Sequence, residues 1–399
     1  MTPGPGEPAT ARGAAGWPAW DAGPALYVHV PFCRHRCHYC DFNTYLLDPD
    51  LKRRYLTALE RELAMLAGDP LLAAKPLVSV YLGGGTPSIL EAAELASLLA
   101  AVRDLFRLEA GAEITVECNP GTLDAAKLAA LRDGGVNRVS LGLQAVQDRL
   151  LRVMGRDHTF RDFLDAYDMV RRAGFDNVNL DLIFGLPGQS LADWEESLDT
   201  AIRLQPEHVS CYGLELHEGT PFHRWWQEGR LALPGEDAER AMFDLARERL
   251  GAAGYEAYEI SNFARPGFRS VHNQVYWLNG SYLGAGPGAW SYWRRERRRN
   301  RLHPAAYADE VLSGRLPVDR REPVDPDRER RETMILGLRL TEGVDCRRFA
   351  ARFGVTPDEA FPAEVDALVR EGWLVREDGR LRLSRRAVPV ANSVLERFV

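Results

Sequence analysis

Short apolar segments recur along the first two thirds of the chain at intervals of roughly 30 to 40 residues. Several are rich in β-branched residues and almost continuously apolar, which is typical of parallel strands covered by helices. These segments predict six strands, at residues 26–32, 78–82, 113–118, 138–143, 178–184 and 208–216.

The stretches between these segments place apolar residues at helical spacing. They predict helices at residues 51–66, 92–106, 123–131, 160–173, 191–204 and 238–252. Six such βα units favour an α/β fold built as an incomplete (β/α)6 barrel, because the two further strands of a closed eight-unit barrel are not evident. Ligands of such folds bind at the carboxyl ends of the strands.

The remaining segments suggest four parts of the chain. Residues 1–24, rich in Pro, Gly and Ala, predict a flexible N-terminal tail before a barrel at 25–264. Residues 265–326 show no regular periodicity and predict irregular, surface-wrapping structure. In 327–399, helices at 328–340, 346–353 and 357–371 precede a hairpin of 373–375 and 381–383, which indicates a winged-helix-like appendage.

Composition narrows the function. The formal net charge of −7 argues against a protein that coats nucleic acid. No apolar run is long enough to span a bilayer and no signal peptide is visible, so we predict a cytoplasmic protein. Of the six cysteines, Cys118, Cys211 and Cys346 stand alone and are expected to be small buried hydrophobes.

The other three cysteines form a compact motif directly after the first predicted strand. Cys33, Cys37 and Cys40 have C-x3-C-x2-C spacing. Three thiolates on one short loop suit a cubane iron–sulfur cluster with one open iron. The alternative is a zinc site with His35 or His38 as fourth ligand, although zinc usually takes paired elements from two places.

Polar residues gather where the later predicted strands end. Gly85 and Thr86 belong to a Gly-Gly-Gly-Thr-Pro turn after the second strand, whose exposed N–H groups suit a carboxylate. Packing explains the other polar residues poorly, so we interpret them as ligand contacts: Glu117, Gln144, Arg156 and Asp181. Singly, each is as well explained by a structural salt bridge or a strand cap.

Taken together, these motifs resemble the coproporphyrinogen III dehydrogenase-like branch of the radical-SAM superfamily, from about residue 26 to the C-terminus. The resemblance is strongest to its HemW-type haem chaperones. It implies that Cys33, Cys37 and Cys40 hold a [4Fe-4S] cluster. It further implies that S-adenosylmethionine is contacted by Tyr27, Tyr39, Gly85, Thr86, Glu117, Gln144, Arg156 and Asp181.

Two features separate the members of this branch. True dehydrogenases have a further cysteine two residues after the third, where this chain has Phe42. The segment His272-Asn-Gln-Val-Tyr-Trp277 resembles the HNxxYW motif of the haem chaperones. Imidazole is a common haem ligand, so His272 is the candidate axial ligand. Alternatively, His272 is a polar loop residue and Tyr276 and Trp277 anchor the core.

Two further segments carry weaker signals. The glycine-rich run Gly284-Ala-Gly-Pro-Gly288 predicts a close approach of the backbone to the cluster, a cofactor or another loop. The arginine run at 294–299 suits porphyrin propionates, but such runs are more often solvated edges.

The resemblance favours a haem chaperone that binds haem, delivers it to apo-haem proteins and cleaves S-adenosylmethionine reductively. An electron donor such as flavodoxin or ferredoxin is implied, and no nucleic acid. The alternatives are an oxygen-independent coproporphyrinogen III dehydrogenase, which the missing cysteine argues against, and a zinc-holding binding module. Homodimer formation and peripheral membrane contact stay open.

Overall fold

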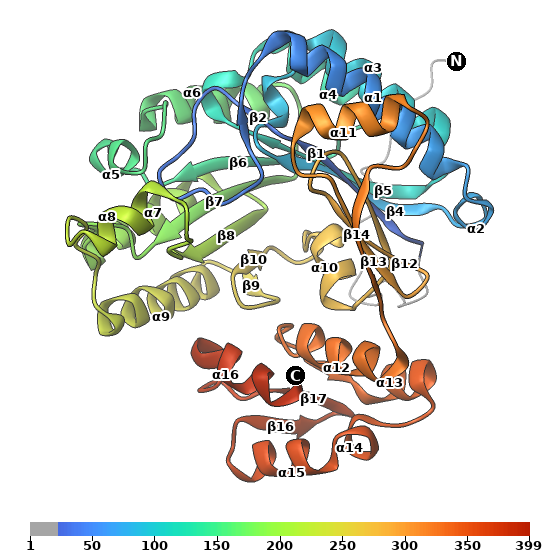
Figure 1. The fold of residues 1–399 in the computed structure, drawn as a ribbon. Coiled ribbons are helices and arrows are strands. Elements are labelled where there is room, and N and C mark those ends of the chain that lie inside the picture. Colours follow the sequence, from blue (N-terminus) through green and yellow to red (C-terminus); the bar gives the residue numbers. More distant parts are fainter. Residues whose placement is uncertain (1–22) are drawn as a thin grey trace, which may run out of the picture.

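The computed structural model describes residues 23–399, so nearly all of the predicted N-terminal tail lies outside the described residues. An open, curved sheet runs through the larger part of the molecule (Figure 1). Six of its strands are parallel neighbours: β1 (Ala25–Val30), β4 (Leu77–Gly84), β5 (Leu108–Cys118), β6 (Arg138–Gln144), β7 (Val178–Phe184) and β8 (His208–Gly213). The predicted incomplete (β/α)6 barrel is confirmed.

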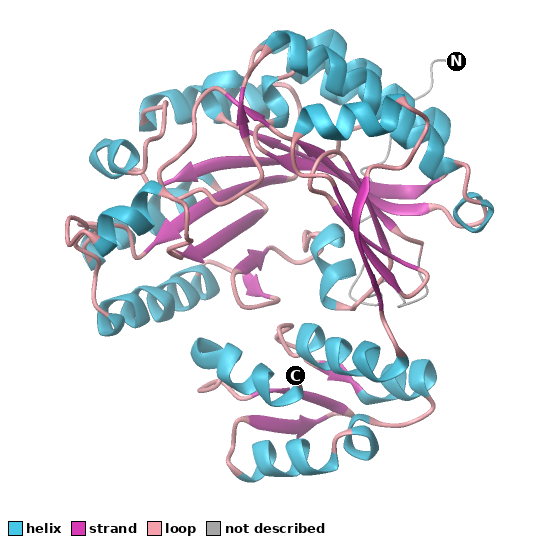
Figure 2. Cartoon of the chain, viewed as in Figure 1, coloured by secondary structure: helices cyan, strands magenta, loops and turns pink. Residues whose placement is uncertain are grey.

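Helices cover the outer face of these strands (Figure 2). They are α1 (Pro49–Ala67), α3 (Ala92–Leu105), α4 (Ala125–Asp133), α6 (Phe160–Arg172), α7 (Leu191–Leu204) and α9 (Glu236–Ala252). Local sequence fixes where several begin: Thr159 and Ser190 cap α6 and α7, each accepting from the backbone N–H three residues on. The apolar faces of the helices and strands form one continuous core.

Short elements that periodicity cannot reveal complete the barrel half. They are β2 (Phe32–Cys33), β3 (Tyr45–Leu46), α2 (Pro70–Ala73), α5 (Asp148–Val153), α8 (Pro221–Gln227), β9 (Glu256–Ala257) and β10 (Asn262–Ala264). The isolated cysteines behave largely as predicted: Cys118 and Cys211 are buried, whereas Cys346 is only half-buried.

The prediction of irregular wrapping structure for residues 265–326 is wrong. The segment contains α10 (Val271–Trp277), β11 (Tyr282–Ala285), β12 (Trp290–Trp293), β13 (Glu296–Asn300), α11 (Pro304–Leu312) and β14 (Val318–Pro323). Strand β11 pairs in parallel with β1, and β12, β13 and β14 follow as antiparallel neighbours. These strands are short and partly charged, so their sequences lack the apolar runs of the barrel strands.

The C-terminal part forms a smaller unit with its own apolar core. Helix α12 (Pro326–Gly337) leads into α13 (Cys346–Phe353), α14 (Pro357–Ala360), α15 (Pro362–Arg370) and α16 (Ala391–Leu395), and the strands are β15 (Val344–Asp345), β16 (Leu374–Glu377) and β17 (Arg380–Leu383). The hairpin of β16 and β17 agrees with the prediction. One predicted helix is two, because Pro362 starts a new helix after Phe361.

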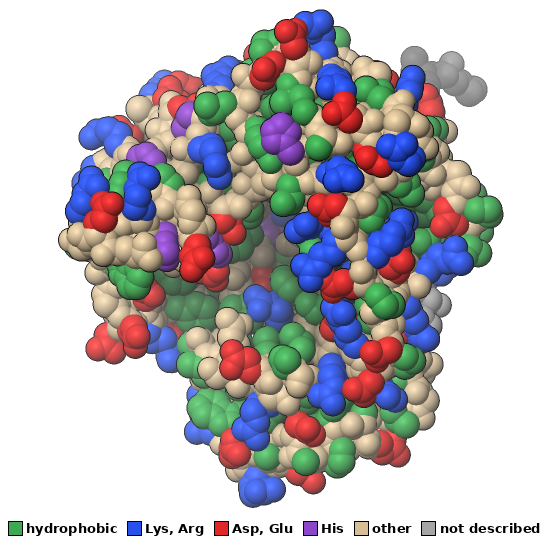
Figure 3. Space-filling view, viewed as in Figure 1, with side chains coloured by type: hydrophobic (Ala, Val, Ile, Leu, Met, Phe, Trp, Pro, Cys, Tyr) green, Lys and Arg blue, Asp and Glu red, His purple; other side chains and the backbone are tan. Residues whose placement is uncertain are grey.

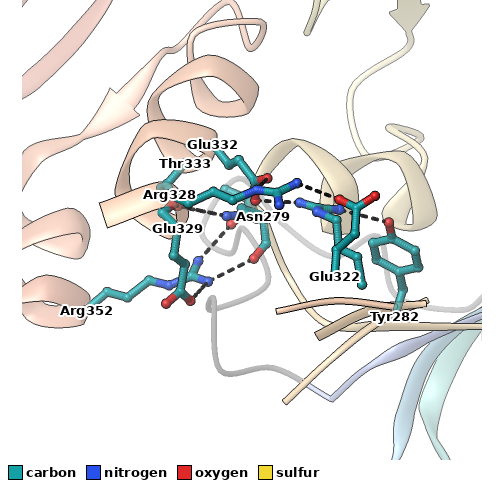
Figure 4. Close-up of polar contacts among 10 residues, drawn as sticks. Asn279, Tyr282, Glu322, Arg328, Glu329, Glu332, Thr333 and Arg352 are labelled. Atoms are coloured by element: carbon teal, nitrogen blue, oxygen red, sulfur yellow. Dashed lines mark hydrogen bonds and ion pairs between the residues drawn. The ribbon is translucent and has the colours of Figure 1, made fainter. Parts of the chain in front are cut away.

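A network of polar contacts joins this unit to the end of the large sheet (Figure 4). The Asn279 amide donates to Thr333 Oγ1 at 3.0 Å. Arg352 pairs with Glu329 at 2.6 Å and also donates to the Asn279 carbonyl. The turn that follows helix α10 is thereby tied to α12 and α13. No helix in the described part of the chain is long and apolar enough to cross a membrane.

Candidate functional site

A cavity of about 440 Å³ opens at the carboxyl ends of the barrel strands. Almost all of the predicted site residues line it, namely Cys33, Cys37, Tyr39, Cys40, Gly85, Thr86, Glu117, Gln144, Arg156 and Asp181. They come from different βα units, and the parallel sheet brings them together. Two predicted residues, Tyr27 and His272, are not among its lining residues.

The three thiols lie on the loop that β2 and β3 pin at its base. Thr86 Oγ1 lies 3.5 Å from Cys33 Sγ, and Arg156 Nη1 lies 3.6 Å from Cys37 Sγ. Within residues 23–399, no three His, Cys, Asp or Glu side chains converge as ligands of a single metal ion. A cubane cluster does not require such convergence, because each thiolate binds a different iron.

The environments of the three thiols differ. Burial raises the pKa of Cys33 to about 11 and also raises the pKa of Cys40. Burial opposes ionisation of Cys37 as well, but the hydrogen bond from His35 and the charge of Arg156 lower its pKa below the ordinary value. Positive charge and hydrogen-bond donors therefore surround one thiol that a cluster would require as thiolate.

The glycine turn brings backbone against backbone. Gly84 has φ +111°, and a Cβ on Gly85 would lie 2.7 Å from the Phe32 carbonyl oxygen. Only glycine permits this approach of the turn to the cysteine loop. The Gly84 N–H donates to Glu117 Oε2 at 3.0 Å, so the turn is fixed from both sides.

Glu117 is an acceptor held inside the cavity. The Tyr81 hydroxyl donates to Glu117 Oε1 at 2.7 Å. Burial raises the pKa of Glu117 to about 7, with the Tyr81 hydrogen bond opposing the rise. A desolvated carboxylate of this kind suits a ligand that carries hydroxyl or amino donors.

Gln144 and Arg156 define a second side of the cavity. Gln144 has φ +68°, a left-handed conformation that is uncommon for residues other than glycine and concentrates at functional sites. Arg156 Nη2 donates to Asn119 Oδ1 at 2.6 Å, and Asn119 Nδ2 donates to Thr86 Oγ1 at 3.0 Å. Arg156 Nε, although buried, has no hydrogen-bond partner in the described residues.

Asp181 is another buried carboxylate that lines the cavity. Its carboxylate accepts from Ser140 Oγ at 2.9 Å and from Asn179 Nδ2 at 2.9 Å. Burial raises its pKa, and these hydrogen bonds oppose the rise. Sequence reasoning missed Asn119 and Tyr81. Asn119 follows Glu117 by two residues, which could have signalled it, but nothing in the apolar strand around Tyr81 marks that residue.

His272 lies behind the cavity, on α10. It is 1% exposed. Its Nδ1 shares a hydrogen bond with Ser79 Oγ at 3.0 Å, and its Nε2 shares one with the Tyr276 hydroxyl at 2.9 Å. Its ring stacks on Tyr81 with centroids 4.9 Å apart. Haem ligation by His272 stays a prediction, and it would require breaking one of these contacts.

Tyr27 also lies beside the cavity rather than in its wall. Its hydroxyl shares a hydrogen bond with His29 Nδ1 at 3.0 Å, and its ring stacks on Tyr81. Its predicted contact with S-adenosylmethionine stays a prediction.

The glycine-rich run after β11 supports the cysteine loop. A Cβ on Gly288 would lie 2.6 Å from Asn43 Nδ2, and one on Gly286 would lie 2.4 Å from the His29 carbonyl oxygen. Asn43 Nδ2 donates to the carbonyls of Pro287 and Leu302. The predicted close approach is therefore made to another loop, the one that carries the cysteines.

Comparison with known proteins agrees with this geometry. The Radical SAM superfamily matches residues 27–201, and the HemN C-terminal domain matches residues 324–390. The protein called Heme chaperone HemW from Bacillus subtilis is 37% identical over 94% of this chain and 99% of its own length. The chain belongs to the HemW family of radical-SAM proteins.

Further relatives and one solved structure are also similar to this chain. The HemW of Mycobacterium tuberculosis H37Rv is 39% identical over 93% of both chains. The mitochondrial radical S-adenosyl methionine domain-containing protein 1 of Bos taurus is 35% identical over 93% of this chain and 86% of its own. Coproporphyrinogen III oxidase (HemN) from Escherichia coli has the same fold, with a TM-score of 0.82 over 96% of this chain and 91% of that one at 24% identity.

Membership of the radical-SAM superfamily implies a [4Fe-4S] cluster and S-adenosylmethionine. The HemW chain fits both groups. Three thiols face one cavity, and the buried Glu117 and Asp181 carboxylates are acceptors for hydroxyl and amino groups. The buried Arg156 offers an unpartnered N–H for a carboxylate.

Proposed function

We propose that this HemW protein is a haem chaperone, which binds haem and delivers it to apo-haem proteins. The observation that carries the proposal is the near full-length similarity to the Bacillus subtilis protein named Heme chaperone HemW, with 94% and 99% of the two chains aligned. The intact cavity supports it. The C-terminal unit that matches the HemN domain is present as well.

Within this function, Cys33, Cys37 and Cys40 would hold the cluster at the cavity that they line. Gly85, Thr86 and Arg156 would bind the methionine carboxylate, since they offer N–H and hydroxyl donors. Glu117, Gln144 and Asp181 would bind the ribose and amino groups, with Tyr39 against the cofactor. A reduced cluster would supply the electron for reductive cleavage of a C–S bond of S-adenosylmethionine.

The protein itself would position the two bound groups and exclude water from them. Thr86 and Arg156 donate to the Sγ atoms of Cys33 and Cys37, and hydrogen bonds to these ligand sulfurs would tune the potential of a bound iron–sulfur cluster. The cluster would receive its electron from a flavodoxin or ferredoxin. Dimer formation, membrane contact and the cytoplasmic location stay predictions.

The first test is reconstitution of the cluster under anaerobic conditions, followed by a haem titration and transfer to an apo-cytochrome. We expect close to four irons and four sulfides per chain, near-stoichiometric haem binding and loss of haem to the acceptor. The Cys33→Ala, Cys37→Ala, Cys40→Ala triple variant is the control for the cluster. Zinc in place of iron would contradict the cluster assignment, and a wild type that binds no haem would contradict the chaperone.

A second assay separates the chaperone from the dehydrogenase. Phe42 is 61% exposed at the position where the dehydrogenases have a further cysteine. We therefore expect no protoporphyrinogen from coproporphyrinogen III under anaerobic conditions with reductant and S-adenosylmethionine. Formation of protoporphyrinogen would overturn this part of the proposal.

A further inference from the structure

The cysteine loop, residues 32–47, has two surfaces. One lines the cavity, to which the loop contributes residues 33–37, 39–42 and 44. Residues 45–47 are not among the lining residues and belong to a second surface. The space-filling view shows a hollow on one face of the molecule, with apolar side chains at the surface above it, where β2 and α11 lie (Figure 3).

The second surface of the loop is apolar. Leu46 is 61% exposed and Leu47 is 37% exposed. Leu302 is 43% exposed and follows the same surface, because its carbonyl accepts from Asn43 Nδ2 at 2.9 Å and from the Tyr45 hydroxyl at 3.3 Å. We call Leu46, Leu47 and Leu302 the leucine patch. Exposed apolar side chains that gather in this way mark an interaction site, whereas single ones are ordinary.

Backbone hydrogen bonds hold the leucine patch against the cysteines. Tyr45 N donates to the Pro31 carbonyl at 2.7 Å, and Leu47 N donates to the Cys33 carbonyl at 2.9 Å. In the pairing of β2 with β3, Leu46 stands opposite Cys33. Since neighbouring strands lie about 4.8 Å apart, a partner on the patch comes within about one strand spacing of a cysteine that would hold the cluster.

Cationic side chains lie on the same loop. Between Cys33 and Leu47 the charged residues are Arg34, Arg36 and Asp41. Arg36 is exposed and has no hydrogen-bond or ion-pair partner among residues 23–399, and Arg34 donates to a backbone carbonyl. Asp41 lies 3.5 Å from a histidine. Because the whole chain has a formal charge of −7, the loop is a basic site on an acidic protein.

Arg36 lies near both the cysteines and the leucine patch. Burial raises the pKa of Cys40 and of Tyr45, and the charge of Arg36 opposes both rises. An acidic partner would be repelled by most of the protein and attracted to this loop. Local charge of this kind fixes the orientation of an encounter more than it adds affinity.

Reductive cleavage of S-adenosylmethionine consumes one electron, which must reach the cluster from another molecule. A carrier on the leucine patch would approach the cluster at Cys33 from outside the cavity and leave the second side of the loop to the cofactor. Transient redox complexes bury less than about 1,200 Å², which suits a patch of a few leucines with arginines beside it.

We propose that the leucine patch, together with Arg34 and Arg36, is the docking surface of an acidic one-electron carrier with a flavin or iron–sulfur centre. The reduced carrier passes one electron to the cluster and leaves oxidised by one electron, and no proton or group moves. The proposal rests on the radical-SAM part of the proposed function and adds the place where its electron enters.

The first test is a binding titration of the reconstituted protein with a bacterial flavodoxin, an acidic flavoprotein. We expect the dissociation constant to rise by about tenfold or more in Leu46→Ser/Leu47→Ser and in Arg34→Glu/Arg36→Glu. Wild-type binding should weaken as salt is raised, and the arginine variant should lose most of this salt dependence. Basic lysozyme should not bind. Wild-type affinity in both variants would overturn the proposal.

A matched control changes the same residue types at the other end of the barrel strands. Leu71 is 53% exposed on α2, which precedes β4, and Arg107 is exposed directly before β5. Leu71→Ser/Arg107→Glu should bind flavodoxin as the wild type does. An equal loss of affinity in this control would show that the protein's overall charge and apolarity govern binding, and would overturn the assignment to the loop.

Reduction of the cluster separates docking from damage to the cluster. Under anaerobic conditions the visible absorbance of the cluster should fall more slowly in both loop variants than in the wild type when reduced flavodoxin is the donor. Dithionite needs no docking surface, so it should reduce all proteins at the same rate. Slower reduction by dithionite in both loop variants would place their effect on the cluster itself and overturn the proposal.

Other results would assign the surface to a different partner. Unchanged flavodoxin binding with slower haem transfer to an apo-cytochrome would make it the acceptor's surface, and unchanged binding with loss of a dimer in sedimentation would make it an interface between two copies. Either result overturns the proposal. A wild type that binds haem but not flavodoxin would overturn this proposal alone, whereas one that binds flavodoxin but no haem would overturn the chaperone function alone.

Discussion

Strands β6 and β13 belong to the same twelve-stranded sheet but are held by different forces. All residues of β6, Arg138–Gln144, are buried, and its apolar side chains pack into the main core. In β13, Glu296–Asn300, only the last residue is buried. Its arginines form ion pairs instead, Arg297 with Glu332 on helix α12 and Arg299 with Asp319 on the neighbouring strand β14.

The difference shows that the buried and the charged strands of one sheet have different roles. The buried strands place the side chains that we propose as cofactor contacts at their carboxyl ends, where burial removes water from each polar group. The charged strands form an outer brace, and the glycine run before them holds the cysteine loop through Asn43. Arginine–carboxylate pairs at such partly exposed positions add little stability each, so the brace depends on their number and on the aromatic rings beneath them.

The largest expected effect is on the buried side. Leu141 in β6 is fully buried, so Leu141→Ala should lower the free energy of unfolding by about 2–5 kcal/mol. Urea denaturation measures it. Leu105→Ala, at a side chain that is 37% exposed, is the control and should cost much less. Similar losses in the two variants would show that β6 is not held by burial.

The contacts of Glu62, which link helix α1 to the segment around β11 and α11, should make the stability of the protein depend on pH. Glu62 on α1 accepts from Gly286 N and Tyr307 Oη, and burial raises its pKa to about 7. A raised pKa means that the stabilising contribution is full below the unfolded pKa of about 4.3 and is lost as pH rises through 7, by up to roughly 3 kcal/mol.

Thermal unfolding between pH 5 and 8 tests the effect of Glu62. The wild type should lose stability over that interval, whereas Glu62→Gln, which cannot ionise, should lack this component of the slope. Parallel pH profiles of the two proteins would contradict the assignment of the effect to Glu62.

His272 on helix α10 tests whether packing behind the cavity affects the residues that line it. Removal of its ring frees Tyr81, which donates to Glu117, and leaves the Ser79 and Tyr276 hydroxyls without this partner. His272→Ala should lose about 1–3 kcal/mol of stability and weaken S-adenosylmethionine binding by on the order of tenfold. Calorimetric titration of S-adenosylmethionine measures the second effect. Ser79→Ala, which removes one partner only, should lie between; unchanged affinity in His272→Ala would limit α10 to a purely structural role.

The smallest effect belongs to the charged strands. Arg299→Ala should lower the free energy of unfolding by roughly 0.2–1 kcal/mol, and the loss should shrink as salt is raised. Comparison of urea midpoints at low and high salt measures it. An effect as large as that of Leu141→Ala, or one insensitive to salt, would erase the distinction between β6 and β13.

Much of the barrel could be predicted from the sequence because its signals are local. The interval 178–184 is the strand β7 that the structure contains, and α7 has the predicted bounds, since apolar period and capping residues both act within a few positions. The site could be predicted for a related reason. Glu117 and Gln144 end buried strands, and in a parallel sheet all such ends meet at one edge.

Other features were decided only by the tertiary structure. The pairing of β11 with β1 joins distant segments, and the short charged strands beyond it have no periodic signal of their own. The same holds for His272: its sequence motif cannot show that Ser79 and Tyr276 occupy both ring nitrogens. The sequence alone determined which chemical groups the chain carries and at which strand ends they stand. Long-range packing decided which of them face the cavity and which are buried behind it, because hydrogen bonding and desolvation depend on neighbours that are remote along the chain.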